Sequence, residues 1–199
     1  MMSNPSGSSP DFLARLRSET APVHKDLEQN GITSVLMSPS VSTADYILYL
    51  QTVYSLHKAV EEQVFQHLAA LVPDIASRTK TPAIQADLEA LNEPLSGEAP
   101  VFDTGLPSDA AYNLGMLYVS EGSTLGGQYI LKHIRSILGE QTPVNFLNIY
   151  GDRTGSTWKN FIAVLTAYQQ QHPEQSDRII AGALFCFERT HHLFTAAAR

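Results

Sequence analysis

The sequence contains a single cysteine and no long apolar run, and each of these absences excludes a class of protein. With Cys186 alone, the 199-residue chain cannot form an internal disulfide, so it is not an oxidised, disulfide-stapled domain. Cys186 lies in the apolar stretch ALFCFE, where we expect a small buried hydrophobic side chain rather than a reactive thiol. No segment approaches the ~18 consecutive apolar residues that a membrane span requires.

Basic residues are also scarce. Lysine and arginine number 13 against 20 aspartates and glutamates, which gives a formal charge of −7. A broad nucleic-acid interface needs clustered basic side chains, so we expect no nucleic-acid partner. The polar start MMSNPSGSSP has no charged segment followed by an apolar core and is therefore not a signal peptide. We expect residues 1–10 to form a flexible tail and the protein to be cytoplasmic, without membrane association.

The alternation typical of β-strands is missing, and apolar residues recur at helical spacing instead. This pattern predicts helices over 12–29, 42–71, 81–92, 109–138, 156–171 and 174–197. We expect Asp11 to cap the first helix and Pro22 to interrupt and bend it near residues 18–22. The segment SGEAPVFDTGLP is predicted to be a loop. The prediction is an all-α fold, with about seven helices in one bundle over residues 11–199.

Three glycines stand in the middle of the predicted helix 109–138, in the segment EGSTLGGQYILKH. Each glycine costs a helix interior roughly 1 kcal/mol relative to alanine, so their presence needs a reason. Gly122 and Gly126 are four residues apart, so they leave bare backbone on one helical face. Bare backbone serves either the close packing of another helix or the close approach of a flat ligand, and glycines also allow a helix to kink. The glycines alone leave these possibilities open.

Seven histidines are present, but none forms a His-x-x-x-His pair with metal-binding spacing. His24 lies one helical turn before Glu28, whose carboxylate could accept a hydrogen bond from Nδ1–H and leave Nε2 free as a ligand. Arg17 lies two turns earlier on the same face, where it could meet an anion. The same i, i+4 spacing is also typical of a surface ion pair, so spacing by itself does not identify a metal ligand.

The two segments together resemble heme oxygenases. Leu16, Thr20, His24 and Glu28, in LRSETAPVHKDLE, are similar to the proximal-helix pattern Leu-x-x-x-Thr-x-x-x-His-x-x-x-Glu of that family. The segment YVSEGSTLGGQ at 118–128 resembles the glycine-kinked distal helix of its bacterial branch, most of all the enzymes found beside bacterial phytochromes. The resemblance runs from about residue 12 to the end of the chain. It implies a heme oxygenase-like bundle that cleaves heme at a meso-carbon to biliverdin, CO and ferrous iron, using O2 and a reductant.

The resemblance also implies roles for single residues. His24 would be the axial iron ligand and Glu28 its partner, while Gly122 and Gly126 would lie against the heme and leave room for ordered water. Ser123 stands where mammalian-type enzymes carry an aspartate, so the source of that water network stays open. The remaining residues expected to bind the heme are Thr20, Tyr118 and Val119 from the two motifs and the basic residues Arg17, Lys132 and Lys159, which would face the propionates.

No flavin or nicotinamide motif is present, so the resemblance implies an external electron donor, such as a ferredoxin or a reductase. A bacterial phytochrome is a candidate acceptor of the biliverdin. Because Ser123 replaces the aspartate, a non-catalytic heme carrier or sensor on the same fold remains an alternative. Thiaminase-like enzymes, quinone-cofactor oxidases and a purely structural helical module are further alternatives. The apolar setting of Cys186 argues against the thiaminase-like reading, which requires a nucleophilic thiol.

Overall fold

The computed structural model describes residues 12–29, 31–95, 101–102 and 106–198, and all regular structure within them is helical. The α-helices are α1 (Phe12–Gln29), α2 (Gly31–Leu36), α3 (Thr43–Gln63), α4 (Phe65–Leu68), α5 (Thr81–Ala90), α6 (Ala110–Leu138), α7 (Thr154–Gln171) and α8 (Ser176–Ala197). Three short 3-10 helices, η1 (Ile75–Arg78), η2 (Gly151–Arg153) and η3 (Pro173–Gln175), join them. The all-α prediction is confirmed.

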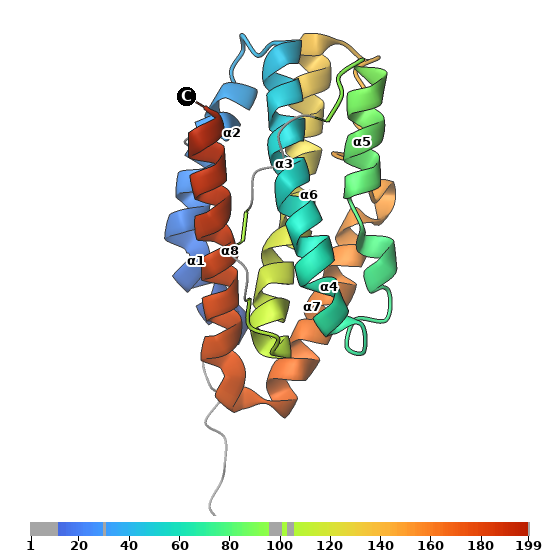
Figure 1. The fold of residues 1–199 in the computed structure, drawn as a ribbon. Coiled ribbons are helices and arrows are strands. Elements are labelled where there is room, and N and C mark those ends of the chain that lie inside the picture. The colour runs from blue at the N-terminus through green and yellow to red at the C-terminus, as the bar shows by residue number, and fades with distance from the viewer. Residues whose placement is uncertain (1–11, 30, 96–100, 103–105, 199) are drawn as a thin grey trace, which may run out of the picture.

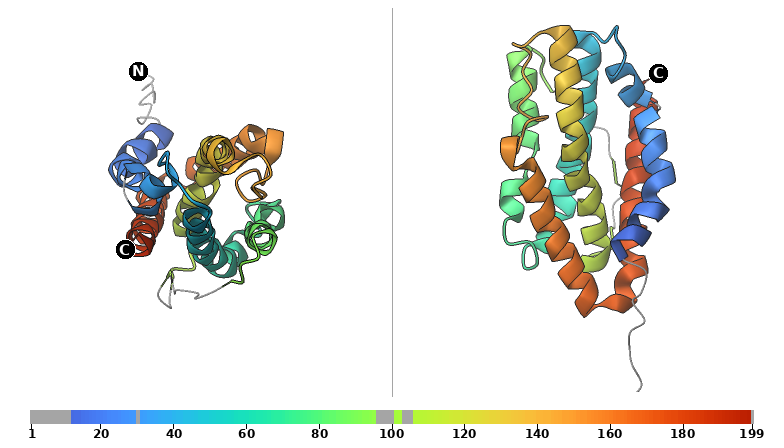
Figure 2. Two further views of the ribbon diagram at one scale, coloured as in Figure 1. Left: turned by 90° about the horizontal axis from the view of Figure 1, so that it is seen from above. Right: turned by 180° about the vertical axis from the view of Figure 1, so that it is seen from behind.

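The long helices run along one axis and form an elongated bundle (Figure 1). Helix α6 packs on α8, α7 and α3, whereas α1 packs mainly on α8 and α2. Figure 2 shows the same arrangement from above and from behind, with α1 and α8 on one side of α6 and α5 and α7 on the other. Helices α1 and α6 ascend in the same direction, and α8, which contacts both, ascends with them to the C-terminus.

The predicted helix starts are confirmed where a capping side chain was visible in the sequence. Ser42 Oγ accepts a hydrogen bond from the backbone N–H of Asp45 at 3.2 Å, and the Asp45 carboxylate accepts one from the N–H of Ser42 at 2.8 Å. This reciprocal pair satisfies two donors that a helix N-terminus leaves without partners. The Asp109 carboxylate caps α6 through a single hydrogen bond, accepting from the N–H of Tyr112 at 2.9 Å.

The structure corrects three details of the prediction. Helix α1 is not interrupted at Pro22, because Pro22 and Ser18 lie on the exposed face, where water can bond to the carbonyl that the proline leaves without a donor. The predicted helix 42–71 is divided, since α3 ends at Gln63 and the short α4 follows. The six-residue α2 was not predicted, being too short to show a periodicity. Asp11, the tail 1–10 and part of the loop 96–107 lie outside the described residues.

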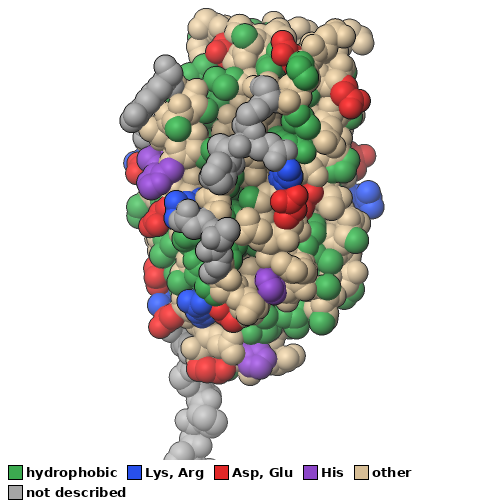
Figure 3. Space-filling view, in the orientation of Figure 1, with side chains coloured by type: hydrophobic (Ala, Val, Ile, Leu, Met, Phe, Trp, Pro, Cys, Tyr) green, Lys and Arg blue, Asp and Glu red, His purple; other side chains and the backbone are tan. Residues whose placement is uncertain are grey.

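Two hydrophobic clusters fill the bundle. One joins α1, α6, α7 and α8, and the other joins α2, α3 and α5 with the segment 144–147. On the face shown in Figure 3, lysine and arginine side chains lie apart from one another and do not form a basic patch. None of the helices in the described residues is long and apolar enough to cross a membrane.

Candidate heme-binding site

His24 projects from α1 with 53% of its side chain exposed. The edge of its ring meets Phe187 of α8, with the ring centroids 5.5 Å apart and the planes at 83°. Within the described part of the chain, Nε2 makes no hydrogen bond. An imidazole that rests on one aromatic ring and is otherwise open differs from a core histidine, which normally bonds through both nitrogens. The geometry therefore leaves one nitrogen available to a ligand from outside.

Glu28 lies one turn beyond His24, as the sequence predicted. The distance from His24 Nδ1 to Glu28 Oε1 is 3.6 Å, which is within ion-pair range but too long for a hydrogen bond. Both side chains are more than half exposed. The expected hydrogen bond is therefore not formed here, although a small rotation of either side chain would close the gap.

Thr20, another residue of the same motif, is buried. Its hydroxyl donates to the carbonyl oxygen of Leu16 at 2.8 Å, so the only hydroxyl proton is used within α1. Threonine commonly bonds to the preceding helical turn in this way. The Thr20 hydroxyl is therefore not free to donate a hydrogen bond to a ligand.

Arg17 and Tyr118 connect α1 to α6. Burial raises the pKa of the Tyr118 hydroxyl, whereas the charge of the Arg17 guanidinium and its hydrogen bond with that hydroxyl act in the opposite direction. The Tyr118 ring also packs against Trp158 of α7, with centroids 5.4 Å apart. Arg17 is exposed beside Tyr118, where its guanidinium can meet an anionic group.

The proximity of the Arg17 guanidinium to the Tyr118 hydroxyl indicates the approximate register of α1 against α6. Helices that run in the same direction advance by 1.5 Å per residue. His24 is seven residues beyond Arg17, or about 10 Å along α1. Gly122 and Gly126 are four and eight residues beyond Tyr118, or about 6 and 12 Å along α6. His24 therefore lies at the level of the two glycines.

The three glycines of the predicted motif in α6 have different surroundings. A Cβ added at Gly126 would meet nothing within 4 Å, and one at Gly122 would meet only the Trp158 ring, at 3.6 Å. A Cβ at Gly127 would instead lie 3.4 Å from the carbonyl oxygen of Leu147, which is a tight backbone contact. Gly127 therefore serves packing against the segment 144–147, whereas Gly122 and Gly126 leave space. Helix α6 is unbroken across all three, and the predicted kink stays a prediction.

Close helix packing, the other role considered for these glycines, occurs two turns earlier. A Cβ at Gly115 would lie 1.9 Å from the carbonyl oxygen of Ile179, and one at Gly182 would lie 2.0 Å from that of Tyr112. These distances are far shorter than any real Cβ contact. The crossing of α6 and α8 thus depends on Gly115 and Gly182, and it does not account for Gly122 or Gly126.

Two exposed apolar residues, Leu125 and Tyr129, were missed by the sequence analysis. They are 43% and 71% exposed. Positions 118, 122, 125, 129 and 132 are spaced by four, three, four and three residues, so they form one stripe along α6. An exposed apolar stripe beside bare backbone is typical of a surface that a flat apolar ligand covers. The spacing of these positions in the sequence would have identified this stripe.

The basic residues predicted for this site lie differently. Lys132 is exposed at the end of the stripe that starts at Tyr118. Lys159 is exposed on α7, but helical geometry turns it by about 100° from its neighbour Trp158, the residue that borders Gly122. The structure therefore brings Trp158, which was not predicted, to the glycine face and gives Lys159 no contact there. Val119, also predicted, is buried in the core.

Ser123 is exposed on α6, and its hydroxyl donates to the carbonyl oxygen of Ser120 at 2.7 Å. Its proton is therefore held within the helix, while its oxygen can still accept a hydrogen bond from water. A serine hydroxyl is not an acid in the accessible pH range. The arrangement can thus order a solvent molecule but does not offer a strong proton donor.

Cys186 is fully buried, as predicted, and burial raises the pKa of its thiol to about 12. Its thiol is not a candidate nucleophile, because the thiolate is the reactive form. In the described ranges no three His, Cys, Asp or Glu side chains gather in a way that could hold a metal ion. A metal would therefore have to bring most of its ligands with it, as heme iron does.

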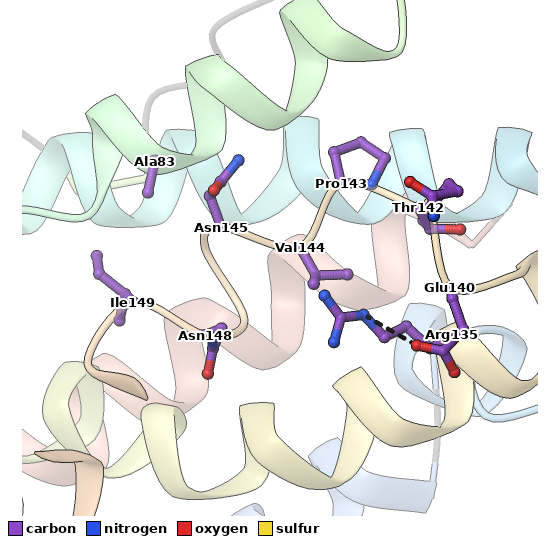
Figure 4. Close-up of a pocket in the computed structure, with 10 residues that line it drawn as sticks. Ala83, Arg135, Glu140, Thr142, Pro143, Val144, Asn145, Asn148 and Ile149 are labelled. Atoms are coloured by element: carbon purple, nitrogen blue, oxygen red, sulfur yellow. Dashed lines mark ion pairs between the residues drawn. The ribbon is translucent and has the colours of Figure 1, made fainter. Parts of the chain in front are cut away.

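A polar cavity of about 540 Å³ lies elsewhere, between α5 and the connection that follows α6 (Figure 4). Arg135 and Glu140 border it, with the Arg135 Nε and a Glu140 carboxylate oxygen 4.0 Å apart. None of the predicted heme-binding residues lines this cavity. It is separate from the space beside His24.

Comparisons with known proteins find relatives of a single family. The sequence model of the family described as heme oxygenase matches residues 10–196. A heme oxygenase of Xanthomonas campestris pv. campestris is 32% identical over 156 residues, which are 77% of this chain and 91% of that protein. The heme oxygenase PigA of Pseudomonas aeruginosa is 34% identical over 125 residues, which are 61% of each chain.

Solved structures give the same result for the fold. The heme oxygenase of Neisseria meningitidis, determined with NO and CO bound, superimposes with a TM-score of 0.75 over 95% of this chain and 92% of that one, at 27% identity. A heme oxygenase from Leptospira interrogans also reaches a TM-score of 0.75, covering 94% of this chain and all of that one. Its 17% identity supports the fold alone.

Proposed function

This chain belongs to the heme oxygenase family, and from that premise we propose that it binds heme between α1 and α6 through His24 and degrades it to biliverdin. One observation supports this assignment above the others. The open His24 imidazole lies at about the level of Gly122 and Gly126, where the backbone of α6 carries no side chain and an added Cβ would meet no backbone atom.

The residues present fit a heme. Its flat apolar ring would cover Leu125 and Tyr129, which water now contacts, and no Cβ at Gly126 would obstruct it. The propionates are anions on one edge of the ring and would meet Arg17 near Tyr118, whereas Lys132, about 21 Å further along α6, is the candidate for a ring bound in the opposite orientation. Lys159 is the weakest of the three basic candidates, because Trp158 occupies the side of α7 that faces α6.

When bound, heme supplies the iron that activates O2 and is itself the ring that is opened. The chain supplies placement and hydration. His24 would provide a neutral nitrogen ligand. Once the imidazole is fixed, its Nδ1–H can donate a hydrogen bond to the Glu28 carboxylate. The bare backbone at Gly122 and Gly126 leaves room for a water that Ser123 can hold, and it keeps bulky side chains away from the ring edge.

Electrons must come from a separate reductase, because the chain carries no flavin or nicotinamide motif. We propose a ferredoxin or a flavoprotein as this donor. We further propose that a bacterial phytochrome accepts the biliverdin, on the similarity of YVSEGSTLGGQ to the enzymes found beside such photoreceptors. Transfer of the product to a phytochrome apoprotein, followed by its red absorbance, tests this second proposal.

The experiment that tests the function is an optical titration of the purified protein with hemin, followed by a reductant in air. Loss of the Soret band, growth of red absorbance and release of chelatable iron are expected. A Soret band that survives the reductant would identify a carrier or sensor instead, the reading that Ser123 keeps open. Failure to bind hemin would reject both functions.

A further inference from the structure

A buried group of charges lies directly behind the glycine face of α6. Glu121, only 1% exposed, accepts hydrogen bonds from Arg78 Nη1 at 2.5 Å and from Lys80 Nζ at 2.6 Å. The hydroxyl of Tyr150 donates to both carboxylate oxygens at 3.2 Å. Arg78 and Lys80 are as deeply buried as Glu121. None of these residues is among those proposed above to bind heme.

The charges in this group balance. Arg78 makes a second, two-point contact with Asp74, from Nε to Oδ1 at 3.0 Å and from Nη2 to Oδ2 at 2.8 Å. Two cations thus meet two carboxylates. Burial and the Glu121 charge raise the pKa of the Tyr150 hydroxyl, so this phenol stays protonated and remains a donor. Every polar atom of the Glu121 carboxylate is therefore held.

The three donors come from two separate parts of the chain. Arg78 ends η1, Lys80 precedes α5, and Tyr150 precedes η2. All of them converge on one side chain of α6. A buried ion pair of this kind adds little net stability compared with apolar packing, but it fixes the orientation of the Glu121 side chain. That orientation is significant because Glu121 comes one residue before Gly122.

A glycine segment has few side chains with which to anchor itself. A Cβ at Gly126 would meet nothing within 4 Å, and one at Gly122 would meet only the Trp158 ring, so these two positions offer no side-chain anchor. Glu121 shares a peptide bond with Gly122, so holding its carboxylate restrains both the height of that backbone and its rotation about the α6 axis. We propose that Glu121, held by Arg78, Lys80 and Tyr150, is the positioning residue that fixes the Gly122 face of α6 against the heme. This inference rests on the proposed function.

The test uses three variants of the full chain. Glu121→Gln removes the negative charge and leaves a buried cation without its partner, so it can also impair folding. The double variant Lys80→Met with Glu121→Gln removes one charge of each sign and keeps the group balanced. Asn113→Ala is the matched control, because Asn113 is fully buried on the same helix and bonds to Pro107 and Asp109, far from the glycines.

Two measurements separate positioning from general stability. Hydrogen exchange of the apo-protein follows the amides of residues 121–127, and infrared spectroscopy follows the C–O stretch of the reduced hemin complex with carbon monoxide. The double variant should exchange these amides at least tenfold faster and show a shifted or broadened C–O band. The control should keep the wild-type band and the wild-type exchange at 121–127.

Wild-type exchange at 121–127 together with an unshifted C–O band in the double variant would overturn the proposal. So would equal changes in the Asn113→Ala control, because the effect would then follow stability rather than Glu121. The exchange measurement requires no heme. It therefore decides whether Glu121 restrains α6 even if the wild-type protein fails to bind hemin, an outcome that would reject the proposed function separately.

Discussion

Gly115 and Gly182 allow the backbones of α6 and α8 to touch. A Cβ on the first would lie 1.9 Å from the Ile179 carbonyl oxygen, and a Cβ on the second would lie 2.0 Å from that of Tyr112. The same helix α6 carries Gly126, whose missing Cβ faces open space. Helix α6 thus uses glycine both for close packing and to leave space. Substitution by alanine distinguishes the two roles.

Gly115→Ala should be strongly destabilising, because a new methyl group would overlap a main-chain oxygen that cannot rotate away. Overpacking a core costs about 1–3 kcal/mol and sometimes more, and we expect a loss of at least about 3 kcal/mol. Gly126→Ala should leave stability unchanged or raise it by up to about 1 kcal/mol, because alanine favours the helix. Urea denaturation measures both, and equal losses would contradict the packing described here.

The same Gly126→Ala variant should impair heme degradation while it folds normally. A methyl group on the open face would intrude on the ring or on its water. We expect slower loss of the Soret band and an altered ratio of biliverdin isomers, measured by chromatography of the product. An unchanged isomer ratio and rate would show that this face of α6 does not meet the heme.

His24→Ala should abolish iron ligation and turnover. Its exposed side chain contributes little to packing, so the helical circular dichroism spectrum should stay as in the wild type. His192→Ala is the matched control, since His192 is an exposed histidine on α8. The Soret maximum and the hemin Kd should change only in the first variant. A parallel change in both would mean that neither histidine is the ligand.

Arg17→Ala should weaken hemin binding about tenfold, the loss that corresponds to one charge-assisted hydrogen bond of about 1.5 kcal/mol. Raising the salt concentration should weaken the wild-type complex more than the variant, because salt screens an exposed ion pair. Lys159→Ala, on the neighbouring helix, should have a smaller effect. Hemin titrations at two ionic strengths measure this order, and a larger effect at Lys159 would reverse our ranking of the basic residues.

His57 should make stability depend on pH. It is buried, with Nδ1 3.3 Å from Ser120 Oγ, and burial followed by the charge of Lys80 holds its pKa well below the usual value. The unfolded chain therefore binds a proton that the folded chain does not, and stability falls as the pH drops below about 6.5. The slope from one such group is at most about 1.4 kcal/mol per pH unit.

The His57→Gln variant isolates this contribution, because other groups are common to both proteins. Protonation of carboxylates such as Asp109, whose pKa is lowered by Arg178 despite partial burial, also destabilises the protein in acid. This contribution is the same in the wild type and the variant, so it cancels when their unfolding free energies are subtracted. Urea unfolding between pH 7 and pH 5 should show a shallower decline for the variant. Identical slopes would mean that His57 becomes protonated without cost in the folded protein.

Much of this molecule could be predicted from local sequence. The caps at Ser42 and Asp109 mark helix starts because each side chain bonds within its own first turn. His24 and Glu28 were recognisable for the same reason, since i and i+4 neighbours meet on any helix. The stripe that includes Leu125 and Tyr129 was equally visible in the spacing, although exposure was needed to show its importance.

The tertiary structure decided what the local pattern left open. Sequence spacing could not show that Gly115 and Gly182 serve helix packing or that Gly126 faces open space. Each outcome depends on which backbone lies opposite the glycine. Nor could it predict the contacts of Glu121 with Arg78 and Tyr150, which are 43 and 29 positions away in the sequence. These hydrogen bonds form only where three chain segments converge. Local bonds follow from the order of residues, whereas burial and long-range contacts exist only after the helices have packed.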